Sequence, residues 1–279
     1  MAQGKVGIVH PGQMGAVAAA TVRNSGHEVY WVSEGRSAET RGRAESAGLR
    51  DAGSVARLCE TCAVMVSVCP PEFAEETARA VAECGFGGLY LDANAISPER
   101  AQRIGRVLSE GGATFVDGCI IGMPTQRRGE TWLYVSGEHA DRALPLFAGG
   151  PLEVEVLGDQ IGQASALKMC FAAQSKGTSA LLAAVMSAAE SLGVRAALER
   201  QWTRSGPNAA RAAASVRQAA PKAWRFVGEM KEIADTFEAA GVPKGFPMAA
   251  EEVFAKLAGF KGALDTRLEE VLRELTGGK

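Results

Sequence analysis

The sequence has few of the features that commit a chain to a metal, a nucleic acid or a membrane. Its three histidines, His10, His27 and His139, do not stand at metal-ligand spacing. The 30 Lys and Arg against 32 Asp and Glu give a formal net charge of −2, which argues against nucleic acid or an anionic membrane as the main partner. No segment is typical of a membrane span or a signal peptide. We therefore expect a cytoplasmic protein that binds a small molecule and no metal.

The cysteines do not indicate a disulfide framework. They are scattered through the chain at positions Cys59, Cys62, Cys69, Cys84, Cys119 and Cys170. We interpret them as reduced thiols, mostly small buried hydrophobic side chains. Cys59 and Cys62 form a C-x-x-C, and a redox pair there is the alternative.

The first half of the chain shows a regular alternation of apolar strand-like runs and helix-like segments. Strands are expected at residues 5–9, 28–32, 64–68, 89–92, 114–116, 132–135 and 153–157. Helices are expected at residues 12–23, 37–47, 72–83, 98–110 and 139–147. This order predicts βαβ units and a mainly parallel sheet covered by helices on both faces.

The second half has a different pattern. No convincing strand follows residue 160, and helices are expected at residues 163–192, 196–204, 208–219, 223–240, 247–258 and 266–275. Pro207, Pro221 and Pro243 separate several of them. We predict an α/β domain over residues 1–160 and an all-α C-terminal domain over residues 161–279.

The turn after the first strand, residues 10–15 (HPGQMG), has the strand–turn–helix context of a dinucleotide-binding motif. Gly12 would let the backbone approach a pyrophosphate, and Gly15 would let the helix pack close to the strand. The amides of Gln13 and Met14 would point at the phosphates. His10 takes the place of the first glycine of G-x-G-x-x-G. We predict that the α/β domain is a Rossmann domain that binds a dinucleotide.

The end of the second strand decides between the two nicotinamide dinucleotides. Ser33 and Arg36 suit a ribose 2′-phosphate, because Ser can donate to it and Arg can bind it bidentately. If Glu34 faced the ribose instead, it would hold the 2′-hydroxyl and NAD would be preferred. We predict NADP, with NAD as the alternative.

Four further segments follow in order: residues 91–98 (LDANAISP), 115–122 (FVDGCIIG), 162–168 (GQASALK) and 189–193 (AESLG). With the opening turn, they resemble the β-hydroxyacid dehydrogenase and 6-phosphogluconate dehydrogenase-like superfamily. The chain is similar to a divergent branch with its own C-terminal helical domain. The resemblance implies hydride transfer between a nicotinamide and a hydroxyl or carbonyl carbon, and a homodimer formed through the helical domains.

The resemblance also implies site residues. Lys168 matches the family's catalytic lysine, and an apolar pocket can lower a lysine pKa so that it serves as general acid and base. Asn94 lies in the segment that the family places beside the nicotinamide. Cys69 and Pro70, after the strand expected at 64–68, complete the predicted cofactor site.

The departures from the family concern the substrate. Ile121 replaces the substrate-binding Ser of the family's S-G-G, so the anchor at Ile121 and Gly122 is altered. Ala172 stands where the family has an Asn, four residues after Lys168. Lys176, on roughly the same helix face as Lys168, is a candidate for binding an acidic substrate. The substrate is therefore not expected to be a standard 3-hydroxy acid.

Two other functions stay open. Imine reductases, which reduce C=N bonds, are another branch of the superfamily, although they usually replace the lysine. The changes at Ile121 and Ala172 would also fit a cofactor-binding sensor or interaction protein that has lost catalysis.

Overall fold

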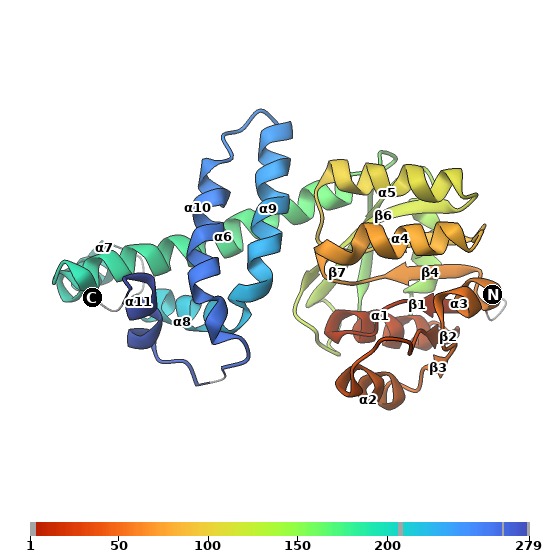
Figure 1. Ribbon diagram of the computed structural model, residues 1–279, viewed down its shortest axis with the longest axis horizontal. Coiled ribbons are helices and arrows are strands. Elements are labelled where there is room, and N and C mark those ends of the chain that lie inside the picture. Colours follow the sequence, from red (N-terminus) through yellow and green to blue (C-terminus); the bar gives the residue numbers. More distant parts are fainter. Residues whose placement is uncertain (1–3, 206–208, 264, 278–279) are drawn as a thin grey trace. The chain divides into compact units, whose positions relative to one another are not determined.

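The computed structural model describes residues 4–205, 209–263 and 265–277. The chain forms two compact units, residues 1–168 and 169–279, and the division falls within helix α6 (Gln163–Ser191) (Figure 1). The first unit contains an eight-stranded sheet, and the second is helical throughout its described residues.

The sheet of the first unit has the strand order β3-β2-β1-β4-β5-β6-β7-β8. Its strands are β1 (Lys5–Ile8), β2 (Glu28–Trp31), β3 (Arg50–Asp51), β4 (Val64–Ser67), β5 (Leu89–Asp92), β6 (Thr114–Gly122), β7 (Thr131–Ser136) and β8 (Glu153–Gly158). The pairs from β3 to β6 are parallel, β7 runs antiparallel to β6, and β8 is parallel to β7. The predicted α/β fold with a mainly parallel sheet is confirmed.

Helices cover both faces of this sheet (Figure 1). They are α1 (Gln13–Asn24), α2 (Ala38–Ser46), α3 (Val55–Thr61), η1 (Pro71–Phe73), α4 (Ala74–Glu83), α5 (Pro98–Glu110) and η2 (Ala140–Leu146). On one face, the apolar side chains of α1 and η2 pack on the strands, as Val22 and Leu146 do. On the other face, α3, α4 and α5 contribute Leu58, Val81 and Ile104. The central strands β1, β4 and β5 are largely apolar on both sides because both sides are buried.

Four elements differ from the expectation. Strand β3 and helix α3 were not foreseen, because two residues are too short for a periodic pattern and α3 buries only Leu58. Residues 140–146 form a 3₁₀ helix, with Pro145 inside it, where an α-helix was expected. Strand β6 runs to Gly122, six residues past the predicted end at residue 116, because its second half pairs with β7.

The strand order fixes where a ligand can bind. β2 lies on one side of β1 and β4 on the other, so the chain reverses direction across the sheet between β1 and β4. In open α/β sheets, ligands bind at such a switch point, outside the carboxyl ends of the strands. The loops that follow β1, β2, β4 and β5 all reach this edge, since these strands are parallel.

The second unit continues α6 and adds α7 (Arg195–Ser205), α8 (Ala209–Ala219), η3 (Ala220–Lys222), α9 (Ala223–Ala239), α10 (Gly245–Lys256), η4 (Leu257–Phe260) and α11 (Leu268–Leu275). Its core includes an edge-to-face ring pair, Phe226 and Phe254, with centroids 5.2 Å apart. Pro207, one of the prolines expected to separate helices, and Asn208, the first residue of the helix expected at 208–219, lie outside the described residues. Within the described chain, every helix is either too short or too polar to cross a membrane.

Candidate cofactor and active site

The turn between β1 and α1 has the two glycine environments that a dinucleotide motif needs. A Cβ at Gly15 would clash with the carbonyl oxygen of His10, so the helix packs on the turn only with glycine there. A Cβ at Gly12 would meet nothing within 4 Å, so this position faces open space. Gly12 caps α1 without any side chain, and the first turn holds no acidic residue. The first amides of α1, including those of Gln13 and Met14, are therefore available to an anion.

The loop after β2 buries Ser33 and leaves Glu34 exposed. Arg41 holds this loop by donating to the carbonyl oxygens of Ser33 (2.7 Å) and Arg36 (3.3 Å). Arg36 itself turns inward, and its Nε is buried without a hydrogen-bond partner among the described residues. Burial lowers the pKa of the Arg36 guanidinium, as expected for a cation that has lost water without gaining an anion. The structure thus brings Ser33 and Arg36 to the edge where the dinucleotide motif lies.

Asn94 ties the ends of β4 and β5 together. Its amide nitrogens, N and Nδ2, each donate to an oxygen of Asp92 at 2.9 Å, and Nδ2 also donates to Ser67 Oγ at 3.3 Å. Its Oδ1 accepts from the backbone N of Cys69 at 2.6 Å. The polar atoms of this buried side chain are thus bonded inside the protein, where they position the loop of Cys69 and Pro70.

Asp92, which sequence reasoning did not single out, is 1% exposed. Its pKa is raised to about 7: burial is the main cause, the charge of Asp117 contributes, and the hydrogen bonds from Asn94 oppose the shift. Asp92 and Asp117 are register partners on β5 and β6, so two carboxyl groups share one buried region. The visible sequence signal was an acidic residue at the end of an otherwise apolar strand.

Asp117 clamps the start of α6. Its Oδ2 accepts from Ser136 Oγ (2.9 Å), from the backbone N of Gly162 (2.9 Å) and from the backbone N of Ser165 (3.1 Å). Its Oδ1 accepts from Ser165 Oγ at 2.7 Å. Ser136 Oγ in turn accepts from the backbone N of Ala164 at 3.0 Å. A carboxylate from another strand thus caps the first turn of α6, which is where negative charge stabilises a helix.

Lys168 follows one turn later on α6. Its Nζ donates to the carbonyl oxygen of Ile120 at 2.7 Å. The pairing of β5 with β6 ends at Asp92 and Asp117, so Ile120 lies beyond the end of β5 at the carboxyl edge of the sheet. The ammonium group of Lys168 is therefore held at the same edge as the cofactor motif.

The predicted substrate residues fall in both units. Ile121 is half-buried and pairs with Trp132, and Gly122 opens the turn to β7 at φ 130°. In the second unit, Ala172 is fully buried. Lys176 is 2.5 Å from Glu229 and 5.2 Å from the ring of Phe226, so its charge has a counter-ion within that unit. The role predicted for Lys176 in binding an acidic substrate gains no support from this pairing.

The C-x-x-C cysteines do not form an activated pair. Burial raises the pKa of Cys59 and of Cys62 to about 12, and the side chain of Cys59 hydrogen-bonds with that of Cys84. All six cysteines are free thiols. Within residues 4–205, 209–263 and 265–277, no three His, Cys, Asp or Glu side chains gather as metal ligands.

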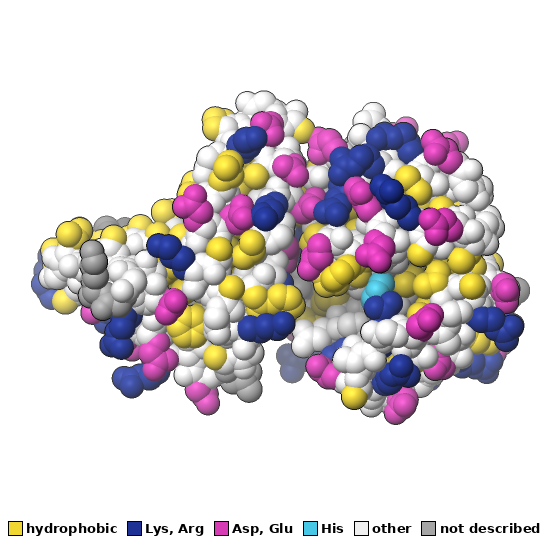
Figure 2. All heavy atoms as spheres, viewed as in Figure 1, with side chains coloured by type: hydrophobic (Ala, Val, Ile, Leu, Met, Phe, Trp, Pro, Cys, Tyr) yellow, Lys and Arg dark blue, Asp and Glu magenta, His cyan; other side chains and the backbone are white. Residues whose placement is uncertain are grey.

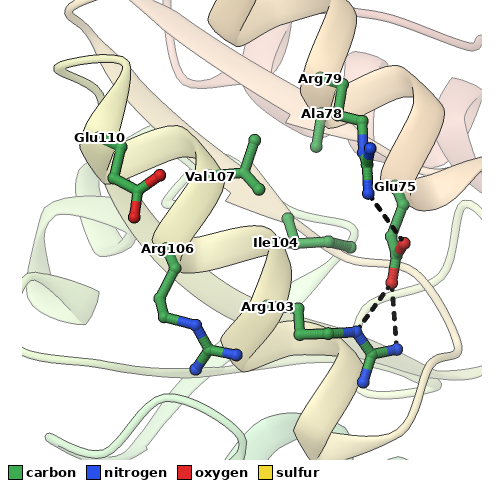
Figure 3. A pocket seen from close by; sticks show the side chains of 8 residues that line it. All are labelled: Glu75, Ala78, Arg79, Arg103, Ile104, Arg106, Val107 and Glu110. Atoms are coloured by element: carbon green, nitrogen blue, oxygen red, sulfur yellow. Dashed lines mark hydrogen bonds and ion pairs between the residues drawn. The ribbon is translucent and has the colours of Figure 1, made fainter.

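A pocket of about 220 Å³ lies elsewhere, between α4 and α5 (Figure 3). Glu75 is bound there by Arg103 (3.0 Å) and Arg79 (3.7 Å), whereas Arg106 and Glu110 lie away from it. Figure 2 shows basic and acidic side chains interleaved over these two helices. No predicted site residue lines this pocket, and its carboxylate Glu75 is already paired with arginines of the same two helices.

The fold and the edge geometry define a dinucleotide-binding Rossmann domain followed by a helical domain. Comparison with protein families agrees: residues 5–148 match the NAD binding domain of 6-phosphogluconate dehydrogenase. The chain belongs to this family, and its first unit is a nicotinamide-dinucleotide-binding domain. Residues 189–257 match a second family, described as a domain of unknown function (DUF1932). The predicted resemblance is confirmed.

Individual relatives cover different shares of the chain. An uncharacterized 28.5 kDa protein of Methanothermus fervidus is 29% identical over 167 residues, which is 60% of this chain and 64% of that protein. The match thus spans less than two thirds of the relative's own length. The conserved protein MTH1747, of unknown function, has a structure similar to 3-hydroxyacid dehydrogenases. It is 29% identical, with a TM-score of 0.68, and the match covers 92% of this chain and 97% of that one.

The fold also matches Mycobacterium tuberculosis 3-hydroxyisobutyrate dehydrogenase, solved with L-serine. That match has a TM-score of 0.73 and covers 98% of this chain and 99% of that one. At 18% identity, it supports the shared fold alone.

Proposed function

We propose that the protein is an NADP-dependent oxidoreductase that acts on a hydroxyl or carbonyl carbon of a small substrate. The observation that carries this proposal is the position of Lys168. In a chain of an NAD-binding family, its Nζ is held at Ile120 O, at the carboxyl edge of the same sheet that carries the dinucleotide motif.

The residues at this edge fit the cofactor. The open face of Gly12 and the uncapped first turn of α1 would hold the diphosphate. Buried Ser33 and Arg36, whose Nε is buried without a hydrogen-bond partner among the described residues, would hold a 2′-phosphate. Glu34, which would favour NAD, is exposed. The loop of Cys69 and Pro70, fixed by Asn94, forms the other side of the switch point.

A bound nicotinamide would supply or accept the hydride. Lys168 would donate a proton from Nζ to the substrate oxygen during reduction and take it back during oxidation. Asp117 would act as a positioning residue, since it fixes the first turn of α6 and therefore the direction of Lys168. Ile121 gives the site an apolar side chain where the β-hydroxyacid dehydrogenases have the substrate-binding hydroxyl of a serine. Because that hydroxyl is missing, we propose a substrate other than a small 3-hydroxy acid.

A homodimer formed through the helical domain is part of the proposal. Leu181, Leu192, Val194 and Phe246 of the second unit are each between 49% and 75% exposed, which leaves apolar surface for a second copy. The mass in solution, measured by light scattering after gel filtration, decides between dimer and monomer.

The experiment has a binding arm and a turnover arm. Calorimetry with NADPH and NADH should show tighter binding of NADPH, and Arg36→Ala should weaken NADPH by roughly 10-fold to 100-fold while NADH is unaffected. Arg57→Ala, an exposed arginine on α3 that pairs with Glu60, is the matched control.

The turnover arm screens aldehydes, ketones, hydroxy acids and imines by the absorbance of the reduced nicotinamide. Lys168→Met should lower turnover by about 10² to 10⁴ while leaving NADPH affinity unchanged. Turnover of imines alone, or equal turnover by Lys168→Met, would contradict the proposed reaction. Cofactor binding without turnover of any class would favour a sensor, and tighter binding of NADH would overturn the NADP assignment.

A further inference from the structure

The residue at the first glycine position of the dinucleotide motif, His10, is the most unusual feature of the cofactor site. No described residue other than glycine has a positive φ, so the turn accepts a side chain at His10 without backbone strain. This side chain is mostly buried, and its Nδ1 has no hydrogen-bond partner among the described residues. Buried polar atoms are rarely left unsatisfied, so an orphan at a ligand site indicates a missing ligand atom.

The side chain of Arg36 also brings an unsatisfied nitrogen to the cofactor site. Its Nε is also buried without a hydrogen-bond partner in the described chain. The two side chains are close enough to interact electrostatically: the pKa of His10 is lowered to about 4, mainly by burial and in part by the positive charge of Arg36. Two nitrogen groups that repel each other when both are charged thus share one desolvated region.

The surrounding groups do not supply the missing negative charge. The first turn of α1 carries no acidic side chain, and Glu34, on the loop after β2, is exposed. Arg43, on α2, donates to Pro11 O at 3.2 Å and is paired with Glu39 at 2.6 Å. The thiol of Cys69, after β4, is neutral because burial raises its pKa to about 12. Among the residues that the structure describes, no carboxylate pairs with His10 or Arg36, so the region around these two side chains is cationic.

We propose that His10 and Arg36 together bind the 2′-phosphate of NADP, and that this binding is coupled to protonation of His10. The inference rests on the proposed function, because it assigns a residue to recognition of the same cofactor. A phosphate dianion beside the imidazole would outweigh the repulsion from Arg36 and favour the imidazolium form. The proton comes from solvent, and the cationic imidazole then donates to a phosphate oxygen.

The coupling has a defined sign. The pKa of His10 is about 4 in the free protein and is higher when the phosphate is bound. Between these two values NADPH binding takes up a proton, so its affinity falls as the pH rises through the bound-state pKa. The 2′-phosphate has its own second pKa near about 6 and loses charge below it, which acts in the opposite direction. NADH lacks this phosphate and serves as the probe without the coupling.

Calorimetry in two buffers of different ionisation enthalpy tests the proposal directly. At about pH 6.5, near the ordinary pKa of His, NADPH should bind with net proton uptake and NADH without it. His10→Asn should abolish the uptake and weaken NADPH about 10-fold, equivalent to about 1.4 kcal/mol, while leaving NADH affinity unchanged. His10→Gly, which restores the motif's usual residue, should behave as His10→Asn does and guards against a folding defect in one variant.

A second readout uses the small number of histidines. With three in the chain, the ring Cε1 signals can be followed by NMR, and the His10→Asn spectrum assigns one of them. Adenosine 2′,5′-bisphosphate should raise the pKa of the His10 signal, whereas AMP should not. The proposal is overturned if AMP raises it equally, or if both His10 variants keep the wild-type ratio of NADPH to NADH affinity. If the wild type prefers NADPH and both variants keep the same ratio of NADPH to NADH affinity, only the role of His10 is overturned. A wild type that prefers NADH overturns the proposed cofactor as well.

Discussion

Ser165 binds Asp117 twice, through its backbone amide at 3.1 Å and through its hydroxyl at 2.7 Å. Asp117 belongs to β6 and Ser165 to the first turn of α6, so this double contact fixes the helix start to the sheet. Lys168 is on the same helix, one turn further on. The orientation of Lys168, the proposed proton donor, therefore depends on the buried carboxylate of Asp117. These bonds act on Lys168 only through the first turn of α6.

Asp117→Asn should destabilise the protein strongly. An amide has one acceptor oxygen where the carboxylate has two. Its NH2 group would therefore face either the hydroxyl of Ser165 or the three donors to Oδ2, and the negative charge at the start of α6 would be lost. We expect a loss of about 2–4 kcal/mol in the free energy of unfolding, measured with urea. Ser136→Ala, which removes a neutral group from the same cluster, should cost about 1–2 kcal/mol. Equal stability of Asp117→Asn and wild type would show that the carboxylate clamp is dispensable.

Substitutions at the two glycines of the β1–α1 turn should have different effects: one should lower stability, and the other should lower cofactor affinity. Gly15→Ala places a Cβ against the carbonyl oxygen of His10, and we expect a loss of about 1–3 kcal/mol in stability. Gly12→Ala meets no atom within 4 Å, and its φ of −65° suits alanine, so stability should change by less than about 0.5 kcal/mol. Its affinity for NADPH should nevertheless fall, because the Cβ fills the space that a diphosphate would approach. Urea unfolding and calorimetry make the comparison, and an unchanged affinity of Gly12→Ala would contradict the assigned position of the diphosphate.

Local patterns were sufficient to predict most of the first unit. Strands such as Lys5–Ile8 and Leu89–Asp92 are short apolar runs between turn signals, and their alternation with helices specifies a parallel sheet. The second half of β6 was missed because its pairing partner, β7, lies beyond a loop in the sequence. Such pairing is a long-range property that no local window contains.

The site was predictable where a backbone motif encodes it and less so where side chains cooperate across the fold. The glycines of the β1–α1 turn and Lys168 stand in recognisable segments, and the structure places them at one edge of the sheet. Asp117 and Ser165 are far apart in the sequence, and nothing local indicates that they bond. The pairing of Lys176 with Glu229 was missed for the same reason, because Glu229 is on α9.

Asp92 should make stability depend on pH. Its pKa is about 7 in the folded protein against an ordinary value of 3.8, so between these values the folded state holds a proton that the unfolded state releases. The stabilisation is complete below about pH 4 and is lost as the pH rises to about 7. Asp92→Asn stays neutral, so the stability of wild type minus that of the variant should fall with rising pH, by at most about 1.4 kcal/mol per pH unit. Urea unfolding at several pH values measures this difference. A difference that is constant with pH, or that grows in favour of wild type, would show that Asp92 is ionised throughout.

Lys176 and Glu229 form an ion pair within the helical unit. Their side chains are only 18% and 12% exposed and lie 2.5 Å apart, so removing one charge leaves the other partly desolvated without a partner. Lys176→Met should therefore lower the free energy of unfolding by about 3–5 kcal/mol, and adding Glu229→Leu should restore most of it. If the lysine instead binds an acidic substrate, the stable double variant should show a raised KM for any acidic substrate found in the screen. We expect its KM to stay close to the wild-type value, because the counter-ion of Lys176 is already present in the protein.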